Sequence, residues 1–212
     1  YDATCPLVTK VHMEVIKMHK QGYRIIMIGH AGHPEVEGTV GQVDSEINVI
    51  EKPAQVWDLE VENPEKVAYV SQTTISYDDA KGLIQELKKR FPLVAEPKKA
   101  DICYATQNRQ DAVKELARRV DLVLVVGSKS SSNSNRLREV AEGAGTKAYL
   151  LDDAGEINPD WFKGIERVGI TAGASAPEIL VDEIVEKLKT LGADEVETMA
   201  GQQEDVKFPL PK

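Results

Sequence analysis

An internal repeat constrains the fold of this chain more than any other feature. Cys5 and Cys103, which lie 98 residues apart, each precede by 24 residues a glycine that ends a short apolar run, Gly29 in the first case and Gly127 in the second. At 68 residues beyond each cysteine the chain has a threonine that follows another apolar run: Thr73 and Thr171. Such self-similarity at a fixed period indicates two copies of one small structural unit.

Apolar runs of four or five residues alternate with amphipathic segments in both copies. Hydrophobic spacing predicts helices over 8–21, 80–91, 106–119 and 180–188 and strands over 24–28, 47–50, 67–70, 122–126, 148–151 and 167–171. Continuously apolar strands between helices are typical of parallel sheets that are covered on both faces. We therefore predict an α/β fold of repeated small parallel modules, with domains over 1–98 and 99–200 and an irregular tail over 201–212. Trp57 and Trp161 are expected in the module cores.

Composition narrows the possible functions. The 212 residues carry 26 Lys and Arg against 35 Asp and Glu, a net charge of −9, which argues against a general nucleic-acid binder. No apolar run approaches the roughly 18 residues of a membrane span. Two cysteines are too few for a disulfide scaffold and suggest a reducing compartment, so we expect a cytoplasmic protein.

Each cysteine stands at the start of a predicted helix. The helix dipole favours a thiolate there, which suits a metal ligand or a nucleophile. A single free cysteine is more often a small buried apolar group. The equivalent placement of Cys5 and Cys103 in the two copies favours a functional role.

A polar turn, residues 29–38, follows the first predicted strand. It contains His30, His33, Glu35 and Glu37. In open parallel sheets, ligands bind at this carboxyl end of the strands. The side chains suit either a zinc site or a pair that transfers protons to a substrate, and a merely solvated turn is the third possibility.

The corresponding turn of the second copy, residues 127–136, is rich in serine and asparagine. Hydroxyl and amide groups beside the amides of a helix start form anion sites. The loop lacks the Gly-Lys-Ser/Thr order of a P-loop, and a flexible serine-rich loop is the alternative. Thr73 and Ser175, each in a turn between a strand and a helix, could add donors to the same ligand.

Six segments in this order resemble the 4-hydroxy-3-methylbut-2-enyl diphosphate reductase family, the last enzymes of the methylerythritol phosphate route to isoprenoids: residues 2–6, 29–38, 72–74, 102–106, 131–135 and 171–175. The resemblance covers essentially residues 1–200. It implies three α/β modules around a central [4Fe–4S] cluster, each module supplying one cysteine. Cys5 and Cys103 match the second and third cluster ligands, so one iron would be left open to the substrate.

The resemblance also implies the chemistry. Two electrons, from a donor such as ferredoxin or flavodoxin, and two protons would remove the substrate hydroxyl as water and give isopentenyl and dimethylallyl diphosphate. Glu35 matches the proton-delivering residue, and His33 and Thr73 match substrate-binding neighbours. Four residues match the diphosphate cradle: Ser131, Ser132, Asn133 and Ser175.

The chain departs from the family pattern in one respect. The family's first module, with its own cysteine and two further histidines, has no counterpart in these 212 residues. We therefore expect the sequence to be a fragment that alone holds no stable cluster and is inactive. Two other classes stay open: a zinc enzyme using Cys5, His30, His33 and Cys103, and a non-catalytic phosphate-binding module that uses only the serine-rich loop.

Overall fold

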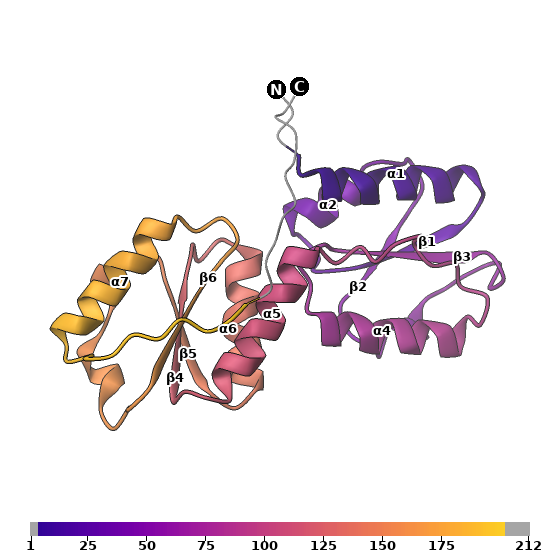
Figure 1. The fold of residues 1–212 in the computed structure, drawn as a ribbon. Helices are drawn as coiled ribbons and strands as arrows, with labels where there is room; N and C mark the ends of the chain where they lie inside the picture. The colour runs from indigo at the N-terminus through magenta and orange to yellow at the C-terminus, as the bar shows by residue number, and fades with distance from the viewer. Residues whose placement is uncertain (1–3, 202–212) are drawn as a thin grey trace. The chain divides into compact units, whose positions relative to one another are not determined.

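A computed structural model describes residues 4–201 of the chain, which divide into two compact units between Cys103 and Tyr104 (Figure 1). Each unit contains one three-stranded parallel sheet with helices on both faces. The α/β fold with repeated small parallel sheets is therefore confirmed. None of the helices in this described part of the chain is long and apolar enough to cross a membrane.

The first unit runs through seven elements: α1 (Pro6–Lys20), β1 (Arg24–Ile28), α2 (Pro34–Val40), β2 (Asn48–Ile50), α3 (Gln55–Asp58), β3 (Val67–Ser71) and α4 (Tyr77–Arg90). Its sheet has the order β2-β1-β3, and the central residue Ile26 of β1 is paired with Asn48 and with Tyr69. The central strand β1 is thus hydrogen-bonded to a neighbour on both sides. The carboxyl ends of β1 and β3 lie next to each other at Ile28 and Ser71.

The side chains of β1 point alternately to the two faces of the sheet, so the core of this unit has two layers. Ile26 and Ile28 pack in the cluster that contains α4, whereas Ile25 and Met27 pack in the cluster that contains α1 and α2. Figure 1 shows these helices on opposite faces of the sheet. All four side chains are at most 2% exposed. Burial of each such side chain is worth roughly 1.5–3 kcal/mol, so the sheet edge that carries the polar turns rests on a rigid base.

The second unit has the same strand order, β5-β4-β6. Its elements are α5 (Tyr104–Ala117), β4 (Leu122–Val126), α6 (Ser132–Gly143), β5 (Lys147–Leu151), the 3₁₀ turns η1 (Ala154–Glu156) and η2 (Pro159–Phe162), β6 (Val168–Ala172) and α7 (Glu178–Thr190). Val123 and Val125 face α5 and α6, and Leu122, Leu124 and Val126 face α7 and the 3₁₀ turns.

The predicted elements are all present, with ends shifted by a few residues. Helix α1 begins at Pro6, two residues before the predicted start, because proline suits the first helical position. The prediction for Trp57 was wrong. It lies on the four-residue α3, is 55% exposed, and its Nε1 donates to Glu86 Oε2 over 3.2 Å. Trp161 stacks on Tyr149 and packs against its core. Of the predicted tail, residues 202–212 lie outside the described residues.

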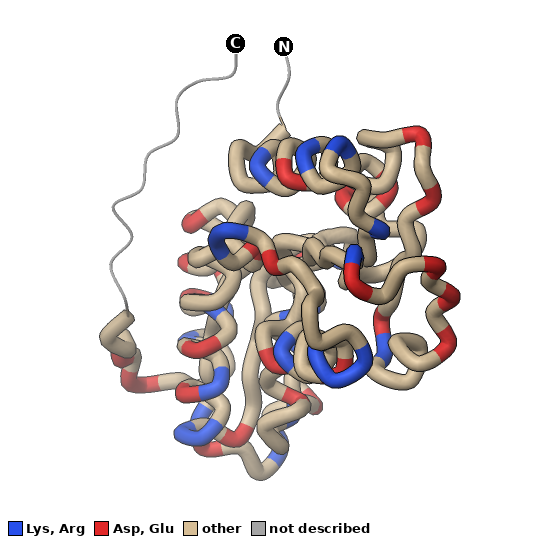
Figure 2. Tube along the Cα trace, turned by 90° about the vertical axis from the view of Figure 1, so that its right-hand side faces the viewer, with Lys and Arg blue, Asp and Glu red and all other residues tan. Residues whose placement is uncertain are grey.

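The exposed helix faces carry both signs of charge. Figure 2 shows Lys and Arg interleaved with Asp and Glu along the chain. Several pairs lie one helical turn apart, such as Glu86 with Lys89 at 2.5 Å and Glu186 with Lys189 at 2.7 Å. Exposed pairs of this kind contribute about 0–1 kcal/mol each, so they mainly keep the surface solvated.

Candidate functional site

The turn after β1 is shaped by a glycine and a capped helix. A Cβ on Gly29 would lie 2.8 Å from Val36 Cγ2 and 3.0 Å from Gln72 Cβ, so only glycine lets the turn pass this close to the end of β3. His33 is the N-cap of α2, and its Nδ1 accepts a hydrogen bond from the Glu35 N–H over 3.1 Å. With Pro34 at the first helical position, this cap fixes where Glu35 points.

Two hydrogen bonds tie this turn to the end of β3. The Gln72 side chain accepts from the His30 N–H over 3.0 Å, and Glu35 Oε1 accepts from the Thr73 N–H over 2.6 Å. Gln72 and Thr73 are 0% and 5% exposed, whereas Glu35 is partly exposed. The Glu35 carboxylate is therefore anchored by one oxygen at the edge of the unit.

Thr73 also connects this carboxylate to a cysteine. The Thr73 carbonyl accepts a hydrogen bond from the Cys103 N–H over 3.0 Å. Hence a continuous path of two hydrogen bonds runs from Glu35 through one residue of the β3–α4 turn to Cys103. Cys103 is partly buried and immediately precedes α5.

Cys5 occupies the N-cap of α1. It is exposed, its carbonyl accepts the Thr9 N–H over 3.0 Å, and its side chain makes no capping hydrogen bond. Both cysteines are free thiols. Cys5 and Cys103 thus lie at or next to helix starts, as predicted.

In the second unit the predicted anion loop leads into α6. Ser131 is the N-cap, and its Oγ accepts from the Ser134 N–H over 3.3 Å. Asn133 is 8% exposed, and both its Oδ1 and its Nδ2 are buried without a hydrogen-bond partner. A buried amide left unpaired costs roughly 1–3 kcal/mol, so a ligand that pairs with it gains that amount back.

Two glycines, Gly127 and Gly173, pack closely against the first turn of α6. A Cβ on Gly127 or on Gly173 would lie 2.3 or 2.2 Å from the Oγ of Ser134, which is 1% exposed. The ends of β4 and β6 therefore approach α6 more closely than any larger residue allows. The same Cβ on Gly173 would be 3.8 Å from Asn133 Nδ2, so the turn that contains Ser175 begins beside the amide.

The other members of the predicted cradle are more accessible. Ser131 and Ser132 are partly exposed, and Ser175 is exposed in the turn between β6 and α7. The only lysine of the loop, Lys129, makes an ion pair with Glu156 and lies 4.0 Å from Asp152. The hydrogen bond to Glu156 raises the pKa of Lys129, and its charge is already neutralised by these neighbours.

The zinc alternative receives no support from the geometry of the first turn. His30 Nδ1 lies 3.9 Å from Glu51 Oε2, and His33 Nδ1 is used by the α2 cap. Within residues 4–201, no group of three or more His, Cys, Asp and Glu side chains is arranged to hold a metal ion. In the first unit, hydrogen bonds thus connect His33, Glu35, Thr73 and Cys103. The second unit contains the predicted anion loop.

Sequence reasoning gave no role to several residues that build these sites. Gln72 and Ser134 stood inside the quoted segments, but their contacts depend on strands far apart in the chain. Lys10 and Asp101 form a 3.1 Å ion pair in which the Asp101 side chain is fully buried. A buried carboxylate two residues before Cys103 could have been suspected only from its place next to the cysteine.

The fold defines the class of this protein: an α/β protein built of two small units, each with a three-stranded parallel sheet and a cysteine at or next to the start of its first helix. The comparisons with known proteins narrow this class. The LytB protein family matches residues 1–189, and the chain belongs to this family.

Named relatives agree with the family resemblance. The 4-hydroxy-3-methylbut-2-enyl diphosphate reductase of Methylibium petroleiphilum is 62% identical over 211 residues, which are 100% of this chain and 64% of the relative. The same-named protein of Aromatoleum aromaticum is 61% identical over 212 residues, 100% of this chain and 68% of the relative. The chain thus spans about two thirds of the length of these curated relatives.

A solved structure shows the same fold. The E-1-hydroxy-2-methyl-but-2-enyl-4-diphosphate reductase from Plasmodium falciparum superposes with a TM-score of 0.85 at 37% identity, over 89% of this chain and 59% of that one. The predicted family membership is therefore confirmed.

Proposed function

We propose that the protein to which this chain belongs reduces 4-hydroxy-3-methylbut-2-enyl diphosphate to isopentenyl and dimethylallyl diphosphate. The relatives carry the name of this activity. The observation that carries the proposal is the hydrogen-bonded path from Glu35 through Thr73 to Cys103. It connects a carboxylate that can deliver a proton to the backbone of a cysteine whose thiol can ligate a redox centre.

The thiols fit part of an iron–sulfur site. Iron–sulfur clusters are held by cysteine thiolates, and the two cysteines of this sequence are both free. They supply two of the three thiolates that the family resemblance implies, so the third belongs to a further module. When bound, the cluster would pass the two electrons of the reduction from the donor to the substrate, one at a time.

Glu35 holds and moves protons in this proposal. One oxygen, Oε1, stays bonded to the Thr73 N–H, which leaves Oε2 to carry a proton toward the departing hydroxyl. Two protons and two electrons convert the C–O bond to C–H and release one water. His33, whose Nδ1 is fixed by the α2 cap, presents its other ring nitrogen to the substrate.

The diphosphate is held in the second unit by neutral donors. Asn133 offers a buried, unpaired amide, and Ser131, Ser132 and Ser175 carry hydroxyl groups in the segments that follow β4 and β6. Hydrogen bonds to a charged group are worth roughly 1.5–3 kcal/mol each, so three or four suffice to bind a diphosphate. We place the protein in the cytoplasm because free thiols suit a reducing compartment. The electron donor is ferredoxin or flavodoxin, as the family resemblance implies.

An anaerobic assay of a protein of the relatives' full length that contains this chain tests the proposal. We expect a brown protein with absorption near 400 nm that converts the substrate to both products with a reduced donor. Stoichiometric zinc without colour would instead support the zinc enzyme. Diphosphate binding without any metal would support the phosphate-binding module.

A further inference from the structure

We propose that Lys10 and Asp101 are positioning residues that hold the segment before Cys103 against the helix that starts at Cys5. This inference rests on the proposed function for its biological meaning, but its physical content concerns the first unit alone. The two cysteines stand 98 residues apart in the sequence, and both belong to the compact unit that ends at Cys103.

Lys10 binds three oxygens of one short segment. Its Nζ donates to the Lys99 carbonyl over 2.7 Å, to the Ala100 carbonyl over 3.0 Å and to Asp101 Oδ1 over 3.1 Å. An ammonium group has three protons to donate, and this segment receives all three. Lys10 lies on α1, five residues after Cys5, so the contact ties the two cysteine-bearing segments together.

Asp101 extends the tie to the sheet. Its Oδ2 accepts the Ser71 N–H over 2.9 Å at the end of β3, and its side chain is fully buried. Two residues further on, the Cys103 N–H donates to the Thr73 carbonyl. The segment from Lys99 to Cys103 is therefore fixed at its start by Lys10 and at its end by Thr73.

A buried ion pair such as this one is by itself weak evidence for a role in stability. Burial raises the pKa of the Asp101 carboxyl, while the hydrogen bonds from Ser71 and Lys10 oppose that rise. Desolvation of buried ion pairs commonly offsets their attraction, and their best-attested role is to specify one arrangement. Here the arrangement specified is that of Cys103 relative to α1 and β3.

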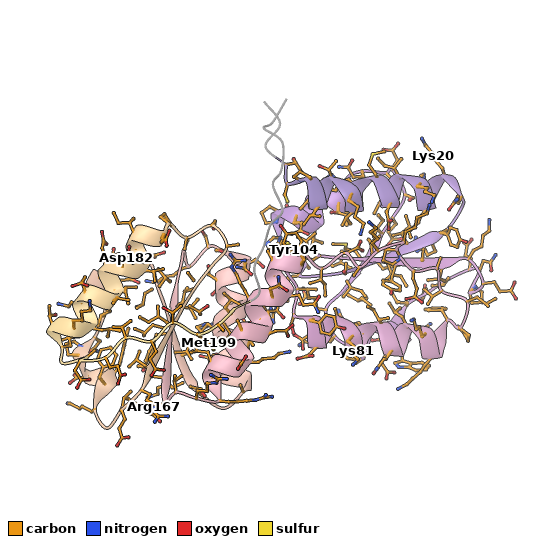
Figure 3. The ribbon with its side chains drawn as sticks, in the orientation of Figure 1. Lys20, Lys81, Tyr104, Arg167, Asp182 and Met199 are labelled. Atoms are coloured by element: carbon orange, nitrogen blue, oxygen red, sulfur yellow. The ribbon has the colours of Figure 1, made fainter. Side chains whose placement is uncertain are left out.

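The test uses the two native cysteines of the 212-residue chain as spin-label sites, without iron or substrate. Dipolar electron paramagnetic resonance then reports the distribution of distances between the labels on Cys5 and Cys103. The variant is Lys10→Met with Asp101→Asn, which removes both charges and leaves no unpaired buried ion. The matched control is Lys20→Met, the same change at the far end of α1, where Figure 3 shows the exposed Lys20.

We expect one narrow distribution in the native chain and in Lys20→Met. In the double variant the distribution should widen at least about twofold, because the segment before Cys103 is then free to open locally. Circular dichroism must show that the variant keeps its helices. A distribution in the folded double variant as narrow as the native one would overturn the proposal, as would a broad one in the native chain.

A second measurement needs no variant and decides the matter if the double variant fails to fold. Hydrogen exchange of the native chain should show the Cys103 amide protected nearly as well as the Val70 amide within β3. Exchange at the rate of an exposed loop would contradict the proposal. Since neither readout uses the reductase reaction, loss of the proposed function and loss of this positioning role are distinguishable.

Discussion

Glu35 and Thr73 come from different turns of the first unit, yet Glu35 Oε1 accepts the Thr73 backbone N–H over 2.6 Å. Because a backbone amide is the donor, this contact does not depend on the threonine hydroxyl. The carbonyl of the same residue accepts the Cys103 N–H, so the Glu35 carboxylate and the Cys103 backbone are both bonded to Thr73. This common link through Thr73 is the basis for the prediction on Glu35.

Replacing Glu35 by Gln should abolish most turnover in the full-length protein and leave ligand binding nearly unchanged. The Gln carbonyl can still accept the Thr73 N–H, but the titratable proton is lost. General acid–base groups contribute about 10² to 10⁴ in rate, and we expect a loss in that range. Single-turnover reduction of bound substrate measures it. The control is Glu37→Gln, an exposed position on the same helix. A near-normal rate in Glu35→Gln would remove this residue from the proton path.

The predicted anion loop, residues 127–136, should bind diphosphate through its neutral side chains and not through its lysine. Ser131→Ala combined with Asn133→Ala should weaken binding of inorganic diphosphate at least about tenfold, because two donors to a charged ligand are lost. Lys129→Ala should have little effect, since Lys129 is already paired with Glu156. Titration calorimetry ranks the two variants. The opposite ranking would show that the lysine charge, and not the cradle, holds the anion.

Gly173→Ala should destabilise the protein by about 1–3 kcal/mol, because the new methyl overlaps a buried hydroxyl. Adding Ser134→Ala should restore most of this loss, since the next contact, Ser134 Cβ, is 3.4 Å away. Urea unfolding measures both variants.

The same rescue should fail at Gly127. There Ser134 Cβ is only 3.1 Å from the added methyl, and the backbone has a φ of 154°. Gly143→Ala, where nothing lies within 4 Å, serves as the control and should not destabilise the protein. Equal rescue at both glycines would mean that Ser134 Oγ does not set the spacing.

The ion pair of Lys88 with Glu96, 2.9 Å long, should give a small stability term that depends on pH. The hydrogen bond from Lys88 lowers the pKa of Glu96. A carboxyl with a lowered pKa in the folded state stabilises above its unfolded pKa, and this contribution is lost as the pH falls through the folded value. Lys88→Met should therefore cost a few tenths of a kcal/mol near pH 7 for this half-exposed pair. The difference from the native chain should vanish near pH 3 in thermal unfolding. A difference that grew on acidification would contradict the assignment.

Much of the fold was predictable because its signals are local. Short apolar runs such as 24–28 and 122–126 correspond to β1 and β4 without any shift, and the spacing of the cysteines from the strand ends predicts two similar sheets. Helix ends were less certain, since caps such as Cys5 at α1 depend on one or two residues. Trp57 shows where composition misleads: a large aromatic side chain on a single helical turn finds no core to enter.

The sequence proposes candidate site residues but does not give the contacts between them. Glu35 and Thr73 stood in separate segments, and their hydrogen bond depends on β1 and β3 being neighbours in the sheet. The pairing of Lys10 with Asp101 joins positions 91 residues apart, which no local pattern indicates. Side-chain roles that depend on such long-range contacts require the folded structure.

Iron and sulfide analysis after anaerobic reconstitution tests the central claim most directly: this chain supplies two thiolates of a cluster that needs a third. The comparison is between the 212-residue chain and a protein extended by an upstream module that carries another cysteine. This module would have about 90 residues, a size at which a single domain can fold on its own. We predict about four irons and four sulfides per extended protein and no stable cluster in the shorter chain. About four irons, retained per 212-residue chain, would contradict the claim that two thiolates are insufficient.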